Sequence, residues 1–306
     1  MASWQSQVLN SIMSMIARPG MSQLGPKGRL TASLSDIREK LEALDARFVD
    51  IPKSLNATFT ELPNCRLWRY RHRESSVDRH LLYLRGGGFC FRTPNTHAHL
   101  IRHFCKEAKV QAWVPDYRLA PEHPFPAAIN DVISSYKSLL DRGIDSQQII
   151  VGGDSAGGHL ALALMIACEQ QQLPIPKGLM LLSPATDLAM TGDAEAILDV
   201  DDPFFTLEGM LRLRSAYLDG HNPSHPMLSP LLADLSMVPN TLLIAGEREL
   251  LRDDSCRLAK KLQQAQRPVR FRLWDDMPHV FPLFDWLPES EKAIKLCNEW
   301  LLSQFD

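Results

Sequence analysis

Ser155 is the residue whose surroundings best suit it for chemistry. It lies in segment 153–157, which reads Gly-Asp-Ser-Ala-Gly, between the apolar run Ile149–Val151 and a helical pattern that begins near Ala156. A strand, a tight turn and a helix in this order present a serine Oγ at the top of a sheet, and the strained, crowded turn requires the glycines. The helix N-terminus also offers a backbone N–H to an oxyanion. The segment lacks both the lysine of a P-loop and the spacing of a dinucleotide-binding loop, so we predict that Ser155 is a nucleophile.

A serine nucleophile needs a general base, and the base needs an acid to orient it. His279 follows the last predicted strand of the chain. This is where the histidine stands when the three residues occur in the order serine, acid, histidine. A histidine in a polar loop is usually a surface residue, but this position favours His279 as the base.

The acid is expected directly after the predicted strand Thr241–Ala245. Four carboxylates compete in the segment that follows: Glu247, Glu249, Asp253 and Asp254. Most of them must be surface charges or charges at a helix N-terminus. We predict Glu249 as the acid, with Asp253 and Glu247 as the alternatives.

Three consecutive glycines, Gly86, Gly87 and Gly88, follow the predicted strand Leu81–Leu84. Without side chains, their backbone N–H groups can approach a ligand closely, as an oxyanion hole requires. A turn with a purely structural role rarely needs three glycines in a row, so we expect this loop to bind the oxyanion.

The elements that must position these residues alternate along the chain. Thr58–Tyr70 has the pattern of an exposed antiparallel strand pair. The further predicted strands are Leu81–Leu84, Trp113–Val114, Ile149–Val151, Leu179–Leu182, Thr241–Ala245 and Val269–Leu273, and the helices between them are His97–Ala108, Ala127–Leu140, Ala156–Gln171, Asp254–Gln266 and Glu289–Leu302. Such alternation predicts an α/β fold with a mostly parallel sheet and helices on both faces.

Two parts of the chain do not fit this alternation. Trp4, Val8 and Ile12, together with Leu9, Met13 and Ile16, recur at helical spacing on one stripe. We expect this stripe to pack over the body of the protein rather than lie on a membrane, because the polar face is uncharged. A second helix follows, with Ser35 or Asp36 as its N-cap. The second part is a long insertion after Asp187 that carries several Asp residues and a helix near Leu207–Leu218. An insertion after a strand's carboxyl end lies above the ligand crevice, so these parts together predict a lid.

Composition excludes several classes of protein. The 306 residues are 45% hydrophobic and 23% charged with a net charge of −3, which is typical of a globular protein and argues against nucleic acid as a partner. The longest apolar run, Leu160–Cys168, is too short to span a membrane. The six cysteines form no C-x-x-C pair and no Cys/His set has metal-ligand spacing, so we expect free thiols in a reducing cytoplasm and no metal. The N-terminus has no Lys or Arg before Arg18, and Ser, Gln and Asn interrupt its apolar residues, so we expect no signal peptide.

With these motifs in place, the sequence resembles the hormone-sensitive-lipase-like branch of the α/β-hydrolase fold, the bacterial family IV carboxylesterases. Three motifs carry the resemblance in that family's order: the glycine loop, the segment Asp116–Pro126, and Gly153–Gly158. The resemblance implies an α/β-hydrolase fold with a helical cap, formed by residues 1–50 and 188–225 around a catalytic domain of residues 51–187 and 226–306. It also implies Ser155 as nucleophile, His279 as base, and oxyanion donors from the glycine loop together with Ala156.

The sequence departs from the family pattern at two positions. Arg85 stands where the family usually has histidine, and Glu249 begins the acid motif where the family often has aspartate. A charged guanidinium at that place needs a carboxylate or carbonyl partner, for which Asp116 or Glu122 is available.

These features together predict a carboxylesterase that acts on short- to medium-chain acyl esters through a serine acyl-enzyme, with no cofactor. The motifs do not specify the leaving group, so an amidase or lactonase with the same triad stays open, as does a catalytically silent binding protein. The expected partner is a small ester, without nucleic acid or membrane insertion. The sequence leaves a homodimer open.

Overall fold

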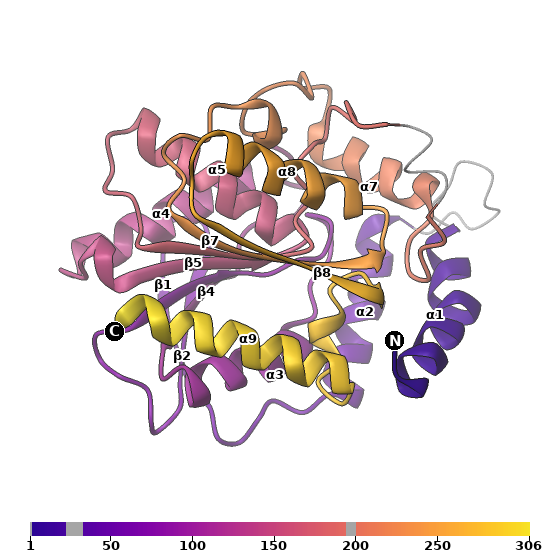
Figure 1. Ribbon diagram of the computed structural model, residues 1–306, viewed down its shortest axis with the longest axis horizontal. Helices are drawn as coiled ribbons and strands as arrows, with labels where there is room; N and C mark the ends of the chain where they lie inside the picture. The colour runs from indigo at the N-terminus through magenta and orange to yellow at the C-terminus, as the bar shows by residue number, and fades with distance from the viewer. Residues whose placement is uncertain (1, 23–32, 194–199) are drawn as a thin grey trace.

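The computed structural model describes residues 2–22, 33–193 and 200–306. Within these residues, eight strands form one sheet in the order β1-β2-β4-β3-β5-β6-β7-β8 (Figure 1). Their bounds are β1 Asn56–Glu61, β2 Arg66–Arg71, β3 His80–Leu84, β4 Gln111–Pro115, β5 Ile149–Asp154, β6 Gly178–Leu182, β7 Asn240–Arg248 and β8 Val269–Pro278. The sheet is antiparallel from β1 to β4 and parallel from β4 to β8. The predicted exposed strand pair and the mostly parallel sheet are therefore confirmed.

Helices cover both faces of the sheet, as the alternation predicted. One face packs against α4 (Ala127–Asp141), α5 (Ala156–Gln170) and α8 (Arg252–Gln264), and the other against α3 (Pro94–Glu107) and α9 (Pro288–Phe305) (Figure 1). Because both faces are covered, every residue of β3, β4, β5 and β6 is buried. This burial explains why these strands read as continuous apolar runs.

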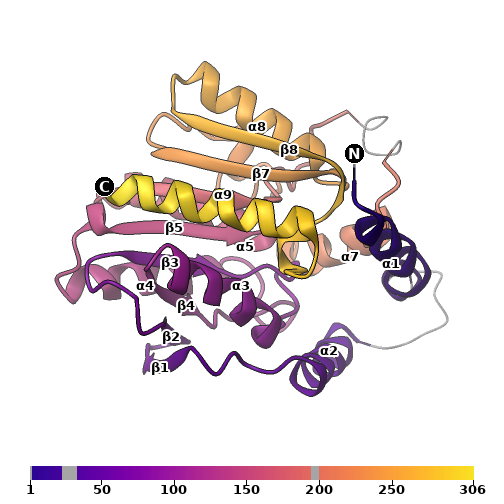
Figure 2. The same cartoon turned by 60° about the horizontal axis from the view of Figure 1, so that its bottom comes forward.

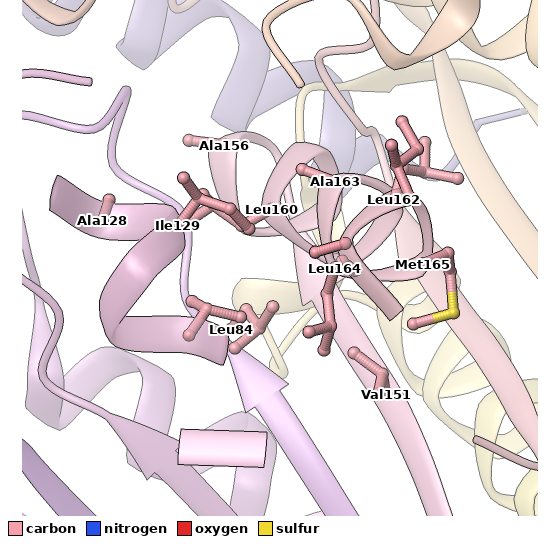
Figure 3. Close-up of a cluster of buried hydrophobic side chains, with 14 of the residues drawn as sticks. Leu84, Ala128, Ile129, Val151, Ala156, Leu160, Leu162, Ala163, Leu164 and Met165 are labelled. Atoms are coloured by element: carbon pink, nitrogen blue, oxygen red, sulfur yellow. The ribbon is translucent and has the colours of Figure 1, made fainter. Parts of the chain in front are cut away.

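Helix α5, which begins directly after Ser155, is the most deeply buried helix of the described chain. All of its side chains from Ala156 to Cys168 are buried. Leu160 and Leu164 meet side chains from β3, β5 and α4 in one cluster (Figure 3). A helix that is apolar on all sides must be enclosed by other elements. The start of α5 is therefore held rigidly against the sheet.

The N-terminal helix α1 (Trp4–Ser22) corrects one expectation. Trp4, Val8 and Ile12 are 71%, 44% and 47% exposed and do not pack over the protein. Leu9, which belongs to the same predicted stripe, is buried together with the polar Asn10, and α1 contacts β8. The helix therefore packs on the protein as expected, but through Leu9 and not through Trp4, Val8 and Ile12.

Hydrogen bonds explain this orientation of α1. The Asn10 side-chain amide donates to the Asp276 carbonyl (3.1 Å), and the Ser3 hydroxyl donates to the Glu289 carboxylate (2.8 Å). These two bonds hold the side of α1 that carries Asn10 against the protein and leave Trp4, Val8 and Ile12 facing outward.

The cap of α2 (Leu34–Phe48) is a second correction. Ser33 is the N-cap, not Ser35 or Asp36, and its hydroxyl accepts from the Asp36 N–H (3.1 Å). The Asp36 carboxylate accepts from the Ser33 N–H in return (3.0 Å). Asp36 is thus the third helical residue of a capping box. In a capping box the N-cap lies three residues before this position, which is Ser33.

We expect Leu164→Ala to lower the free energy of unfolding by about 2–5 kcal/mol, because truncating a fully buried leucine in a close-packed helix leaves a cavity. Urea denaturation of the wild type and the variant measures the difference. Leu232→Ala is the matched control, since Leu232 is 41% exposed and its loss should cost less than about 1 kcal/mol. Equal losses in the two variants would contradict this account of the core.

Candidate active site

Ser155 occupies a strained turn between β5 and α5. Its φ and ψ are 53° and −119°, which is outside the regions that side-chain-bearing residues normally adopt. A Cβ at Gly157 would stand 1.8 Å from the Leu84 carbonyl oxygen, and one at Gly153 would stand 2.5 Å from the Gly157 backbone. Only glycine fits at either position, so the two glycines let this turn pack against β3. Ser155 lines a mostly apolar pocket.

His279 follows β8 and bonds to Glu249, which follows β7. The His279 Nδ1 lies 2.6 Å from the Glu249 Oε2, and the Glu249 side chain is fully buried. The other oxygen of Glu249 accepts from the Gly246 N–H at 3.1 Å, which fixes the carboxylate in the loop. His279 lines the same pocket as Ser155.

The three competing carboxylates lie elsewhere. Glu247 accepts from the Asp276 N–H (3.2 Å), and Asp253 faces Arg257 (3.5 Å). Asp254 accepts from the Thr186 and Asp187 N–H groups, and burial raises its pKa to about 7. Of the four candidates, Glu249 is the one that the fold brings to His279.

The environment of His279 favours its charged form. Burial acts to lower the pKa of His279, but the hydrogen bond and charge of Glu249, together with the carboxylates of Asp202 and Asp154, raise it above the ordinary value of 6.5. These three carboxylates come from three different loops or strands, so the tertiary fold sets the field at the histidine.

Asp202 is a residue of this site that the sequence did not assign to it. The carboxylate is 1% exposed and accepts N–H bonds from Phe204 (2.7 Å), Phe205 (3.0 Å) and Leu250 (2.9 Å). Its bond to Leu250 ties the insertion to the residue after Glu249. Burial raises the pKa of Asp202, while His279 and these N–H groups act in the opposite direction. The sequence Asp-Pro-Phe at 202–204 could have indicated that Asp202 holds a turn, because aspartate commonly accepts from the backbone N–H two residues further on.

The glycine loop lies beside Ser155. Gly87 and Gly88 have φ values of 122° and 57°, and a Cβ at Gly87 would stand 2.1 Å from the Phe91 carbonyl oxygen. Gly88 and Ala156 line the pocket with Ser155. The Gly86 N–H instead faces Asp154. Burial acts to raise the pKa of the Asp154 carboxyl, but the charge of His97 and hydrogen bonds, including the one from Gly86, hold that pKa low.

Arg85 is buried and paired with a carboxylate. Its guanidinium donates to the Asp116 carboxylate (2.7 Å) and lies 4.5 Å from the centre of the Tyr117 ring. Asp116 is therefore the partner that the sequence suggested, whereas Glu122 pairs with Arg38 (2.8 Å).

The pocket lies between Ser155 and His279 on one side and α7 (Leu207–Leu218) on the other, and its empty volume, including open solvent at its mouth, is about 970 Å³. Helix α7, the described helix of the insertion, lies beyond the carboxyl ends of the parallel strands (Figure 1). Apolar side chains dominate its lining: Leu188, Phe205, Leu207, Met210, Leu211 and Leu213. The ring of Phe205 meets His279 edge-on, with centroids 5.1 Å apart.

Two further properties concern the described residues alone. No three of their His, Cys, Asp and Glu side chains gather in a way that could hold a metal ion. None of the helices they form has both the length and the apolar character needed to cross a membrane.

Comparison with known proteins agrees with this geometry. Residues 81–283 match a family model described as alpha/beta hydrolase fold. An esterase of Acinetobacter venetianus is 37% identical over 232 residues, which cover 75% of this chain and 77% of that protein. An acetyl-hydrolase of Streptomyces hygroscopicus is 34% identical over 224 residues, covering 73% and 75%.

Solved structures are similar over nearly the whole chain. The crystal structure of EstE5 soaked with ethyl alcohol has a TM-score of 0.88 at 32% identity and covers 99% of each chain. An esterase described as belonging to the bacterial hormone-sensitive lipase family has a TM-score of 0.88 at 30% identity and covers 100% of both. The sheet, the serine turn and these matches define an α/β-hydrolase. Within that class, this chain belongs to the hormone-sensitive-lipase family of esterases.

We expect Asp202→Asn to lower the pKa of His279, because it removes one of the negative charges that stabilise the imidazolium. The histidine would then become neutral at lower pH, so the acid limb of kcat/KM for ester hydrolysis should shift to lower pH. In the wild type, the midpoint should lie above 6.5. Rates measured between pH 5 and pH 9, with imidazole NMR titration beside them, test this.

Asp201→Asn is the control for this variant, since its carboxylate is 64% exposed and faces Arg248 at 2.9 Å. Its acid limb should stay in place. An acid limb that does not move in Asp202→Asn would show that Asp202 does not act on His279.

Proposed function

We propose that this esterase hydrolyses short- to medium-chain acyl esters through a serine acyl-enzyme, with Ser155, His279 and Glu249 as its triad. The observation that carries the proposal is the 2.6 Å bond between His279 and the buried Glu249, in the pocket that Ser155 also lines. A nucleophile, a base and an orienting acid are the three groups that acyl transfer requires.

In the first half of the reaction, His279 removes the Ser155 proton through Nε2, because Nδ1 is bonded to Glu249. The serine oxygen attacks the ester carbonyl, and the N–H groups of Gly87, Gly88 and Ala156 stabilise the oxyanion. The imidazolium then protonates the departing alcohol, leaving an ester on Ser155. Gly86, whose N–H faces Asp154, braces the loop instead of binding the oxyanion.

In the second half, His279 activates a water molecule, which attacks the acyl-enzyme carbonyl at the same oxyanion site. Collapse of this second tetrahedral intermediate releases the carboxylic acid and returns the proton to Ser155. Glu249 keeps one imidazole tautomer throughout and stabilises the imidazolium without taking its proton.

The acyl preference follows from the pocket. Its apolar lining favours an alkyl chain, and α7 lies over it with Leu207, Met210 and Leu213 facing the cavity. These side chains limit its length, so short and medium chains should fit better than long ones. The similarity to a protein named acetyl-hydrolase supports a short acyl group.

The direct test is a series of p-nitrophenyl esters from acetate to palmitate, assayed with the wild type and Ser155→Ala. We expect kcat/KM to be highest between acetate and octanoate and to fall steeply at palmitate. Ser155→Ala should lose activity on the order of 10⁴-fold or more, because the triad acts as one unit. A Ser155→Ala protein with a tenth of wild-type turnover would refute the proposed nucleophile, and a maximum at palmitate would refute the proposed chain length.

The acid assignment has its own test. We expect Glu249→Ala to lower kcat on the order of 10⁴-fold, since the imidazole loses its orienting partner. Asp253→Ala and Glu247→Ala are matched controls from the same loop, and their kcat should stay within about threefold of the wild type. Carboxylates at a helix start or on the surface contribute only about 0.3–1 kcal/mol to stability and do not orient the imidazole. If Asp253→Ala were the inactive variant, the assignment of Glu249 would be wrong.

A further inference from the structure

We propose that α2 holds the oxyanion loop in its catalytic shape, with Arg38 as the main positioning residue. The inference rests on the proposed oxyanion hole of Gly87 and Gly88. It concerns the segment from Arg85 to Thr96, which we call the oxyanion segment.

The oxyanion segment has a backbone that needs outside support. Gly87, Gly88 and Phe89 have φ values of 122°, 57° and 62°, three consecutive residues in the left-handed half of conformational space. For a bulky residue such as phenylalanine this conformation is disfavoured, and it persists only where surrounding contacts hold it. The contacts that surround this segment therefore decide where its N–H groups point.

One face of α2 meets the segment along its length. Arg38, Glu42 and Asp45 are spaced i, i+4 and i+7, which places them on the same side of the helix. Helix α2 lies beside α3, whose first residues are the last residues of the oxyanion segment (Figure 2). Each of the three side chains bonds to a different part of the segment.

Arg38 contacts the part nearest the glycines. Its guanidinium donates to the Cys90 carbonyl (2.7 Å) and to the Ala120 carbonyl (2.6 Å), as well as to Glu122. The Ala120 N–H in turn donates to the Phe89 carbonyl at 3.0 Å. Arg38 thus links the backbone at Cys90 to the backbone at Ala120, and both of these residues adjoin Phe89, the first in sequence and the second through its hydrogen bond. Bonds from a charged donor to carbonyl oxygens are about twice as strong as neutral ones, so this contact can hold a strained turn.

Glu42 contacts the middle of the segment through a chain of charges. Arg92 donates to Glu42 (2.8 Å) and to Asp116 (2.9 Å), and Asp116 also accepts from Arg85 (2.7 Å). Against the effect of burial, the two guanidinium groups hold the pKa of the Asp116 carboxyl low. The chain of charges ends at Arg85, the residue directly before the glycines.

Asp45 contacts the far end of the segment. Its carboxylate accepts from the Asn95 N–H (2.7 Å), the Thr96 N–H (3.0 Å) and the Thr96 hydroxyl (2.6 Å). Thr93, at the N-cap position of α3, makes no side-chain capping bond. A carboxylate from α2 therefore caps α3 in its place.

The first turn of α3 leads back to the glycines. His97 lies 3.3 Å from the Asp154 carboxylate, which the Gly86 N–H also faces. Both ends of the oxyanion segment are therefore connected to α2, one through Asp116 and the other through α3. A displacement of about 1 Å at a catalytic group can cost on the order of 100-fold in rate, so these contacts should be measurable in kcat.

The test is Arg38→Gln, assayed on p-nitrophenyl butyrate and with an alkyl trifluoromethyl ketone as inhibitor. The ketone adds to a serine hydroxyl and forms an oxyanion, so its affinity reports the oxyanion hole. We expect kcat to fall about tenfold to 100-fold, KM to stay within about threefold, and the inhibition constant of the ketone to rise by the same factor as kcat/KM falls. A role limited to stability would change the melting temperature without this parallel loss.

Variants on the same helix provide the controls. Glu39→Gln and Arg47→Gln each remove an exposed charge from α2 and should keep wild-type kcat and ketone affinity. Arg38→Lys keeps the charge but not the forked donor geometry, so it should recover only part of the loss. If Arg38→Gln does not fold, Glu42→Gln tests the same idea through Arg92 and should show the same parallel loss.

Two outcomes would overturn the inference. One is a folded Arg38→Gln enzyme with kcat within twofold of the wild type, and the other is a loss of kcat with unchanged ketone affinity. Either result, with Ser155→Ala inactive, would leave the proposed function intact and remove only the role of α2. An active Ser155→Ala would refute the proposed function itself.

Discussion

The close contact between the turn at Ser155 and the end of β3 is the constraint on which the rest of the structure depends. The Leu84 carbonyl stands where a Cβ at Gly157 would have to go, so α5 can begin at this place only if that residue is glycine. Burial of α5 on all sides then prevents the turn from relaxing. The strain at Ser155 is therefore maintained by packing, and the glycine loop after Leu84 is brought next to the serine by the same contact.

Charges around the pocket are arranged by elements far apart in sequence. Glu249 follows β7, Asp154 ends β5 and Asp202 belongs to the insertion, yet all three act on His279. Each carboxylate has its own hydrogen-bond donors: Gly246 for Glu249, Tyr83 for Asp154 and Leu250 for Asp202. A buried negative charge is tolerated only with such partners, which is why the site depends on backbone N–H groups as much as on side chains.

Much of the site could be predicted because its signals are local. The motif at Ser155 depends on a strand, a turn and a helix that are adjacent in sequence, and the glycine loop directly follows its strand. The position after the strand does not separate Glu249 from its neighbours, since four carboxylates stand within eight residues. The bond to His279 separates them, and it joins loops 30 residues apart.

The sequence alone determined the α/β class, the order of the strands along the chain and the candidates for the reacting side chains, because periodicity and glycine spacing are properties of short segments. Only the tertiary structure decided which face of α1 is buried, that Asp202 joins the insertion to the acid loop, and that α2 contacts the oxyanion segment. Asn10, Asp202 and Arg38 each bond to backbone groups that are distant in sequence. Every residue other than proline offers the same backbone N–H and C=O groups, so no sequence pattern marks the partner, and only the folded chain selects it.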